Sequence, residues 1–310
     1  MANNFKSHKI IFWGTPEFAV PALKFLLKLG IIQLVITQPD RPAGRGQKIA
    51  VSPVKKYCLE NNLKFLEPDN LDDKFILALQ KYLPATFVVV AYGKIIPQNI
   101  LDLSALPAIN IHPSKLPQLR GPSPIQTAIL RGFESTAVSL MQLDKKMDHG
   151  PILGQIEAKI WPNEGYLALA GRLSQLGAQI LEMKLLDYLN GQLNPLSQDD
   201  SQATYCQLIK KENGKIDWHK SAREIHNQIR AYQPWPSTFA KLGDLTVKII
   251  KAEIVDKDLA PGEILFGREI IIGTASAALK ILELQPKDKK IMSATEFIRG
   301  YQKYLSLKFD

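Results

Sequence analysis

The sequence predicts an α/β protein in which a doubly wound, mostly parallel sheet is followed by a smaller antiparallel β-barrel. Three observations favour this fold class. Strand patterns alternate with helical patterns over the first two thirds of the chain, which is typical of parallel sheets. The run TFVVVAYG (86–93) is almost continuously apolar, as in a strand buried on both faces. Short β-rich runs crowd the last third, as in a small barrel.

The elements of the first part follow from apolar runs and the residues that stop them. Thr15 is a candidate N-cap with Pro16 in the first turn, and Gly30 ends that helix. Ser52 caps a second helix in the same way. The predicted strands are 9–14, 31–37, 86–93, 108–112 and 136–143, and the predicted helices are 15–30, 52–62 and 165–190.

The pattern changes after a polar, proline-containing stretch at 191–205, which resembles a linker. A helix is predicted within 221–236, and a capping box at 293–297 opens a last helix. The β-rich runs between them are 237–242, 245–255, 262–266, 269–275 and 278–286. We therefore expect a first domain over 1–190, a linker over 191–205 and a second domain over 206–310.

Composition limits the classes of function. The formal net charge is +9, and residues 206–310 contribute +5 of it, so a polyanionic partner is one interpretation of the basic C-terminal part. The two cysteines, Cys58 and Cys206, lie far apart without metal-ligand spacing, which argues against a disulfide scaffold or zinc site. No apolar run is long enough to span a bilayer, and no leader is evident. We expect a cytoplasmic protein without a membrane partner.

Asn110 and His112 end a predicted strand and precede a loop rich in proline and glycine. Strand alternation directs both side chains to the same face. A structural interpretation is that Asn110 only satisfies backbone groups at the strand end. The functional interpretation is a pair that activates a carbonyl, in which an amide N–H holds a developing oxyanion and an imidazole donates or carries a proton.

The segment LDKKMDHGPIL (143–153) adds Asp144, Asp148 and His149 in a predicted loop. A carboxylate close to the Asn110 and His112 pair would stabilise imidazolium, or accept a proton from an attacking amine. The residues alone do not decide between the two aspartates, and His149 is expected to be an exposed loop residue.

TQPDRPAGRGQK (37–48) places Arg41, Arg45 and Lys48 in a long loop between a strand and a helix. A solvated loop is the structural interpretation. The functional one is a basic finger that contacts a phosphate backbone or a base edge, since the flat arginine fork makes two parallel hydrogen bonds. Gly14 stands alone where a dinucleotide fingerprint needs three glycines, so nicotinamide binding is not expected.

Taken together, these segments resemble the methionyl-tRNA formyltransferase family along essentially the whole chain. The likeness is carried by IIFWGTPEFAVPAL, TQPDRPAGRGQK followed by SPVK, VVVAYGKIIP, INIHPSKLPQLRGPSPIQ, MDHGPIL and IDWHKSAREIHNQIRAYQPWP. Single pieces occur in other folate-dependent formyltransferases. The arginine loop and the last block make the resemblance specific.

The resemblance implies a Rossmann-type formyltransferase domain followed by a smaller OB-like β-barrel domain that helps to hold tRNA. It also implies formyl transfer from 10-formyltetrahydrofolate to the methionine α-amino group of initiator methionyl-tRNA, by a monomer and without a metal. The implied site residues are Asn110, His112 and Asp148 for catalysis, Arg41, Arg45 and Lys48 for tRNA, and Ser114, Lys115, Leu116 and Pro117 for the folate.

Departures from the family pattern lie close to that site. Lys115 stands where the family's SLLP has leucine, which leaves the side-chain role of this position open. Two alternatives also remain: a folate-dependent formyltransferase acting on another amine, and a nucleic-acid-binding OB protein whose enzyme domain is inactive. Asn110, His112 and Asp148 argue against the second, and the arginine loop argues against the first.

Overall fold

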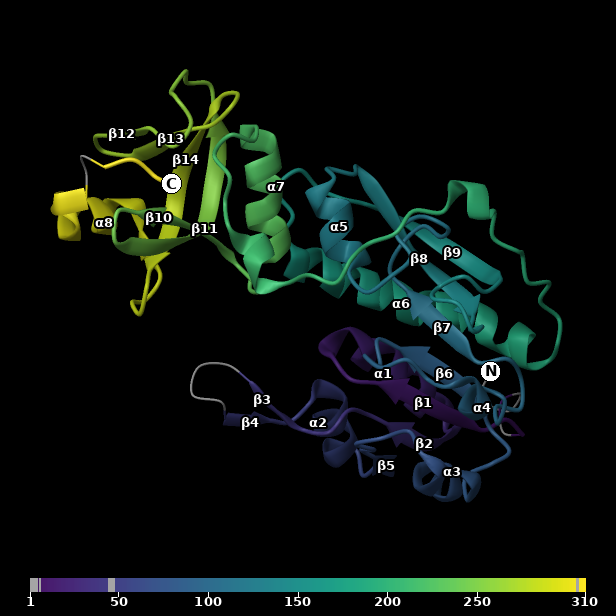
Figure 1. The fold of residues 1–310 in the computed structure, drawn as a ribbon. Coiled ribbons are helices and arrows are strands. Elements are labelled where there is room, and N and C mark those ends of the chain that lie inside the picture. Colours follow the sequence, from purple (N-terminus) through teal and green to yellow (C-terminus); the bar gives the residue numbers. More distant parts are fainter. Residues whose placement is uncertain (1–4, 6, 44–47, 305–306) are drawn as a thin grey trace. The chain divides into compact units, whose positions relative to one another are not determined.

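The computed structural model describes residue 5 and residues 7–43, 48–304 and 307–310, with only the backbone described for 41–43 and 48–49. Contacts divide the chain into two units (Figure 1). Unit 1 comprises Met1–Gly121, Thr136–Ala158 and Ala170–Tyr205, and unit 2 comprises Pro122–Ser135, Lys159–Leu169 and Cys206–Asp310. Two segments of the N-terminal half thus belong to the C-terminal unit.

Unit 1 is built on a seven-stranded sheet with the order β5-β2-β1-β6-β7-β8-β9. Strands β5, β2, β1, β6 and β7 pair in parallel, whereas β7 and β8 are antiparallel. The predicted α/β class with a mostly parallel sheet is confirmed. The strands are β1 Ile10–Gly14, β2 Ile32–Ile36, β5 Phe65–Leu66, β6 Thr86–Val90, β7 Ile109–His112, β8 Ser135–Gln142 and β9 Ile152–Lys159.

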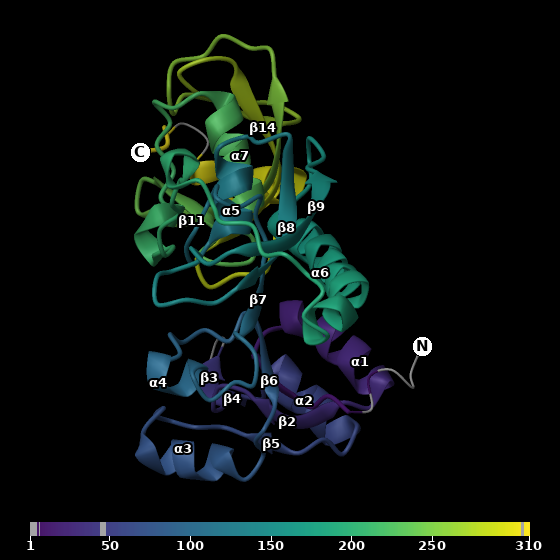
Figure 2. The same ribbon diagram turned by 90° about the vertical axis from the view of Figure 1, so that its right-hand side faces the viewer.

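Helices cover both faces of this sheet, with α1 and α6 on one side and α3 and α4 on the other (Figure 2). Trp13 of β1 packs edge-on against Phe75 of α3 and Tyr92, with ring centroids 5.8 and 5.2 Å away. Gly177 lets α6 lie close to Ile111 of β7. The helices are α1 Val20–Leu29, α2 Pro53–Glu60, α3 Asp73–Gln80, α4 Gln98–Leu101 and α6 Tyr166–Leu189.

Two local predictions for unit 1 need correction. The first helix begins at Val20 after a 3₁₀ turn over Glu17–Ala19, and no side chain caps it. The Thr15 hydroxyl instead donates to the carbonyl oxygen of Tyr92 at 2.9 Å, so a tertiary contact uses the group that the sequence assigned to the cap. The predicted end is confirmed, since Gly30 adopts the left-handed φ of 70° that suits glycine.

The stretch predicted as a loop at 37–48 contains an antiparallel hairpin of β3 (Arg41–Ala43) and β4 (Lys48–Ala50). The hairpin projects beyond α2 (Figure 1). Ser52 caps α2 as predicted and accepts from the Lys55 N–H at 3.1 Å. A hydroxyl–hydroxyl hydrogen bond of 3.0 Å joins Ser52 to Thr37, so the two ends of this excursion are tied together.

Unit 2 contains a curled antiparallel sheet with the order β10-β11-β14-β13-β12, and β15 pairs with β14. It forms a half-barrel, as expected of a small OB-like domain. Capping boxes begin α7 at Ser221 and α8 at Ser293, and the second was predicted. The elements are α5 Pro124–Leu130, α7 Ala222–Tyr232, β10 Thr238–Leu242, β11 Leu245–Val255, β12 Ile264–Phe266, β13 Ile270–Gly273, β14 Ala278–Pro286, β15 Met292–Ser293 and α8 Ala294–Gly300.

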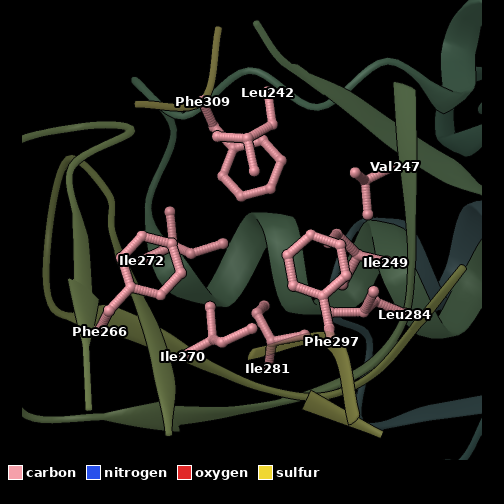
Figure 3. Close-up of a pocket in the computed structure, with 10 residues that line it drawn as sticks. All are labelled: Leu242, Val247, Ile249, Phe266, Ile270, Ile272, Ile281, Leu284, Phe297 and Phe309. Atoms are coloured by element: carbon pink, nitrogen blue, oxygen red, sulfur yellow. The ribbon is translucent and has the colours of Figure 1, made fainter. Parts of the chain in front are cut away.

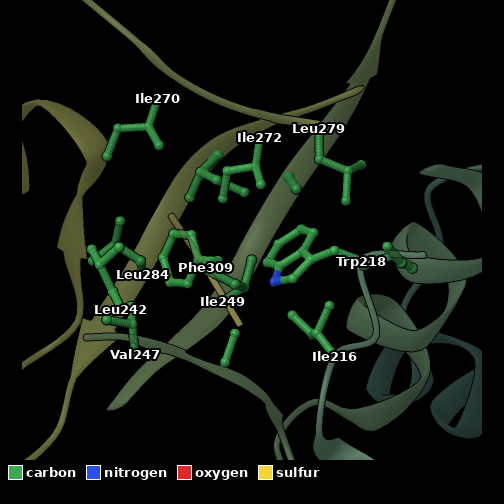
Figure 4. Close-up of a cluster of buried hydrophobic side chains, with 14 of the residues drawn as sticks. Ile216, Trp218, Leu242, Val247, Ile249, Ile270, Ile272, Leu279, Leu284 and Phe309 are labelled. Atoms are coloured by element: carbon green, nitrogen blue, oxygen red, sulfur yellow. The ribbon is translucent and has the colours of Figure 1, made fainter. Parts of the chain in front are cut away.

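Side chains from all sides of this half-barrel meet in one apolar core (Figure 4). Phe309 lies between β10 and the turn at Gly262, pairs with Leu242, and directs its ring into a small pocket (Figure 3). Every residue that lines this pocket is apolar, so the pocket is part of the core and offers no polar group to a substrate.

Candidate functional site

The candidate site begins with β7, which carries Asn110 and His112. Strand alternation places both side chains on one face, and the antiparallel register sets Asn110 opposite Met141 and His112 opposite Ser139 of β8. Only 9% of Asn110 and 5% of His112 is exposed. The Asn110 side chain has no hydrogen-bond partner among the described residues, whereas the His112 ring has contacts on both nitrogens.

The His112 ring is oriented by two groups from other segments. Its Nε2 lies 3.0 Å from the carbonyl oxygen of Leu119. A carbonyl can only accept, so Nε2 carries the proton in this contact. Nδ1 faces Oδ1 of Asp148 at 3.5 Å. An ionised carboxylate in this place favours a second proton on the ring.

Asp148 occupies a tightly fixed loop. Its backbone φ is 49°, a left-handed conformation that aspartate tolerates better than most residues. Oδ2 accepts from the Gly121 N–H at 2.8 Å while Oδ1 faces His112. The other candidate, Asp144, pairs with His149 at 2.6 Å instead. The structure therefore brings Asp148, and not Asp144, to the histidine.

The loop Ser114–Pro117 follows β7 directly and is largely internal. Ser114 is fully buried and Leu116 is 3% exposed, so their side chains do not face solvent. The Ser114 hydroxyl donates to the carbonyl oxygen of Gln118 at 2.6 Å, and the Thr204 N–H donates to that of Pro117 at 3.3 Å. Lys115 is half-exposed and forms an ion pair with Glu157 of β9.

Two polar residues that sequence reasoning missed hold this loop in place. The buried Ser139 hydroxyl donates to the carbonyl oxygen of Ser114 at 2.6 Å. The Gln155 amide donates to Ser139 Oγ at 2.8 Å and to the Leu116 carbonyl oxygen at 2.9 Å. Ser139 lies inside an otherwise apolar strand, and a lone serine there was the only signal for it in the sequence.

The predicted basic finger is only partly described. Arg41 begins β3 and Lys48 begins β4, and the backbones of both are paired in the hairpin. Their side chains are outside the description, and Arg45 lies outside the described residues altogether. Asp40, just before β3, receives the Lys55 ammonium at 2.7 Å, and Glu67 receives the same ammonium at 2.9 Å.

Other chemistries find little support in the part of the chain that the structure describes. Within it, no group of three or more His, Cys, Asp or Glu side chains could hold a metal ion. None of its helices combines the length and the apolar character that a membrane crossing needs. Burial, and to a lesser extent Glu67, raises the pKa of the Cys58 thiol to about 12, so this thiol is not an available nucleophile.

Comparisons with known proteins agree with this geometry. The family model described as Formyl transferase matches residues 8–185, and the model described as Formyl transferase, C-terminal domain matches residues 208–302. The two matches fall on the part built around the parallel sheet and on the part with the antiparallel half-barrel.

Curated relatives align over nearly their full length. A methionyl-tRNA formyltransferase of Thermodesulfovibrio yellowstonii is 43% identical over 95% of this chain and 96% of its own. One of Sulfurihydrogenibium sp. is 39% identical over 97% of this chain and 100% of its own.

Among solved structures, the sugar 3N-formyl transferase WlaRD, crystallised in the presence of dTDP and 5-N-formyl-THF, is 25% identical with a TM-score of 0.68. It covers 91% of this chain and 99% of its own. The N-formyltransferase from Helicobacter canadensis, at 22% identity and a TM-score of 0.66, shares the fold over 88% of this chain and 98% of its own.

Proposed function

The chain belongs to the methionyl-tRNA formyltransferase family, and we propose that Asn110, His112 and Asp148 carry out its chemistry. The enzyme transfers the formyl group of 10-formyltetrahydrofolate to the α-amino group of methionine on initiator methionyl-tRNA. The product is N-formylmethionyl-tRNA for translation initiation. The observation that carries the proposal for the site is the contact of 3.5 Å between His112 Nδ1 and Asp148 Oδ1, on the strand face that also bears Asn110.

Each of the three groups has a distinct task in the proposed mechanism. The neutral methionyl amine attacks the formyl carbon, and negative charge develops on the former carbonyl oxygen. The Asn110 amide donates to that oxygen, because it is a neutral donor without another partner among the described residues. His112 assists, since its Nε2–H is already committed to Leu119 and its Nδ1 faces the carboxylate.

Proton transfer is assigned to Asp148. As the new N–C bond forms, the amine loses a proton to Asp148, directly or through water, and the bond from carbon to N10 of the folate breaks as N10 receives a proton. The Gly121 N–H holds one carboxylate oxygen at 2.8 Å, which leaves the other oriented towards the histidine. Holding these groups in place lowers the entropic part of the barrier.

The loop Ser114–Pro117 is proposed to contact the folate through its backbone and through Lys115. The buried side chains of Ser114 and Leu116 give the loop a fixed shape. Lys115 offers its apolar stem to a ligand while its ammonium stays with Glu157. This arrangement assigns shape to the internal residues and ligand contact to the exposed one.

The basic hairpin is proposed to engage the tRNA through Arg41, Arg45 and Lys48. Its root is fixed by the ion pairs of Lys55 with Asp40 and Glu67. The net charge of +5 in residues 206–310 suits the same polyanionic partner. We further propose that the enzyme acts as a monomer in the cytoplasm, with residues 1–190 as the catalytic domain, 191–205 as a linker and 206–310 as the OB-like tRNA-binding domain.

Single-turnover formyl transfer tests the assignment. We expect Asn110→Ala to slow the chemical step by about 10²–10³-fold and Asp148→Ala by about 10²–10⁴-fold, with folate binding largely unchanged. Folate affinity is measured separately by fluorescence. Wild-type rates in both variants would refute the assignment of these residues, and an inactive wild-type enzyme would refute the proposed activity itself.

A further inference from the structure

The side chain of Gln198 lies between the loop of Asp148 and a buried arginine. Its Nε2 donates to the carbonyl oxygen of Asp148 at 3.0 Å and to that of Gly150 at 2.8 Å. Its Oε1 accepts from Arg120 Nε at 3.0 Å and from Nη2 at 2.9 Å. Both ends of one amide are thus used by groups from two other chain segments.

Arg120 holds Gln198 from a position that cannot move freely. Only 1% of Arg120 is exposed, and its Nη2 also donates to Asp200 Oδ1 at 2.8 Å. The backbone N–H of Arg120 donates to the Thr204 carbonyl oxygen at 2.9 Å. A buried guanidinium with this many partners is expected to be rigid, because any displacement leaves a buried charge unsatisfied.

The neighbours of Arg120 hold the rest of the site. The carbonyl of Leu119 accepts from His112, and the Gly121 N–H donates to the Asp148 carboxylate. Three consecutive residues therefore orient the imidazole, the carboxylate and, through Gln198, the backbone of Asp148. That backbone has the left-handed φ of 49°, which the surrounding contacts must maintain.

We propose that Gln198 is a positioning residue that keeps the Asp148 carboxylate directed at His112. The inference rests on the proposed function, since it gives Asp148 a role in proton transfer. Gln198 has this effect from a segment that the sequence indicates only as a linker. The residue touches neither substrate, and it acts by fixing the loop from the side opposite to Gly121.

Gln198→Glu separates positioning from packing. The carboxylate still accepts from Arg120, so the buried arginine keeps its partner. The oxygen that replaces the amide nitrogen faces the carbonyl oxygens of Asp148 and Gly150, which it repels. The loop should shift, and a displacement of about 1 Å is enough to cost about 100-fold in rate.

Gln228→Glu is a matched control. The Gln228 amide donates to the carbonyl oxygens of Asn213 and Lys215 at 2.8 and 3.0 Å, so the same change removes the same kind of contact within unit 2. Both variants should lose thermal stability to a similar extent. If Gln198→Glu does not fold, Gln198→Met takes its place, because it removes the donor without adding a charge.

The test is a double-mutant cycle on kcat, with saturating 10-formyltetrahydrofolate and methionyl-tRNA. We expect Gln198→Glu to lower kcat by about 10–100-fold with KM for both substrates little changed, and Gln228→Glu to stay within about twofold of wild type. In an Asp148→Asn background, Gln198→Glu should lower kcat by less than about twofold, because an effect that acts through Asp148 is then already lost.

Two results would overturn the inference: an equal loss of kcat in both backgrounds, or a Gln198→Glu variant that matches Gln228→Glu in rate. Either would mean that Gln198 only stabilises the fold. A wild-type enzyme without formyl transfer would instead count against the proposed function, so the two failures are distinguishable.

Discussion

At the scale of single residues, the polar groups around His112 are satisfied by partners from distant segments, whereas a second buried histidine is not. Only 7% of His226 in α7 is exposed, and its Nδ1 has no partner among the described residues. Burial is the main cause of its lowered pKa, and Arg230 and Arg223 lower it further. His226 therefore stays neutral in the folded protein at neutral pH.

This difference predicts how stability depends on pH. Because the folded pKa of His226 is below its ordinary value of 6.5, the unfolded chain binds a proton that the folded chain does not. The free energy of unfolding should then decrease as the pH falls below about 6.5. His226→Gln removes this titration, so its urea-unfolding free energy should fall less between pH 7 and pH 5 than that of the wild type. Equal slopes would contradict the prediction.

The sequence predicts some site residues better than others. Asn110 and His112 stand out because polar side chains end an apolar strand, and family resemblance singled out Asp148. Gln198 gives no such signal, since an amide in a polar, proline-containing stretch is typical of a linker. Its partners are 50 and 78 residues away, and a contact of that range leaves no local pattern.

At the scale of elements, the hairpin β3–β4 depends on an anchor at its root. Lys55 of α2 bridges Asp40 and Glu67, and its side chain is only 18% exposed. The second carboxylate oxygens, Asp40 Oδ1 and Glu67 Oε1, are buried without partners among the described residues. Removing the ammonium would leave two adjacent carboxylates uncompensated.

Lys55→Met should therefore destabilise the protein by about 1–3 kcal/mol, the cost of leaving buried acceptors unsatisfied. Lys56→Met is the matched control. Lys56 loses the same charge on the same helix, but its pair with Glu60 is exposed and 3.9 Å long, so about 0.5 kcal/mol or less is expected. Denaturant unfolding measures both, and equal effects would argue against the anchor. If the hairpin engages tRNA, Lys55→Met should also weaken tRNA binding more than Lys56→Met.

Most elements could be predicted from local patterns, and the exceptions have physical reasons. Strand β9 was missed because the turn residues before it suggested a continuing loop. Gly150 permits that turn, since a Cβ there would collide with the backbone of Gln142. The hairpin β3–β4 was missed because proline and glycine in the segment argue against regular pairing.

At the scale of the whole molecule, the parallel sheet and the antiparallel half-barrel agree with the predicted order of fold types along the chain. The division into units is less simple than the sequence suggests. Residues 122–135 and 159–169 cluster with the C-terminal unit, and α5 packs against α7. No local pattern announces that a segment joins a distant part of the chain, so the boundaries at 190 and 205 stay a prediction.

The most direct measurement is transfer of a labelled formyl group from 10-formyltetrahydrofolate by the full chain to different acceptors. Methionine charged on initiator tRNA should be formylated, whereas deacylated tRNA should receive no label and free small amines should react far more slowly. This outcome is expected because the tRNA supplies binding contacts and the methionyl amine supplies the nucleophile. Equal transfer to small amines, or release of formate without an acceptor, would contradict the account.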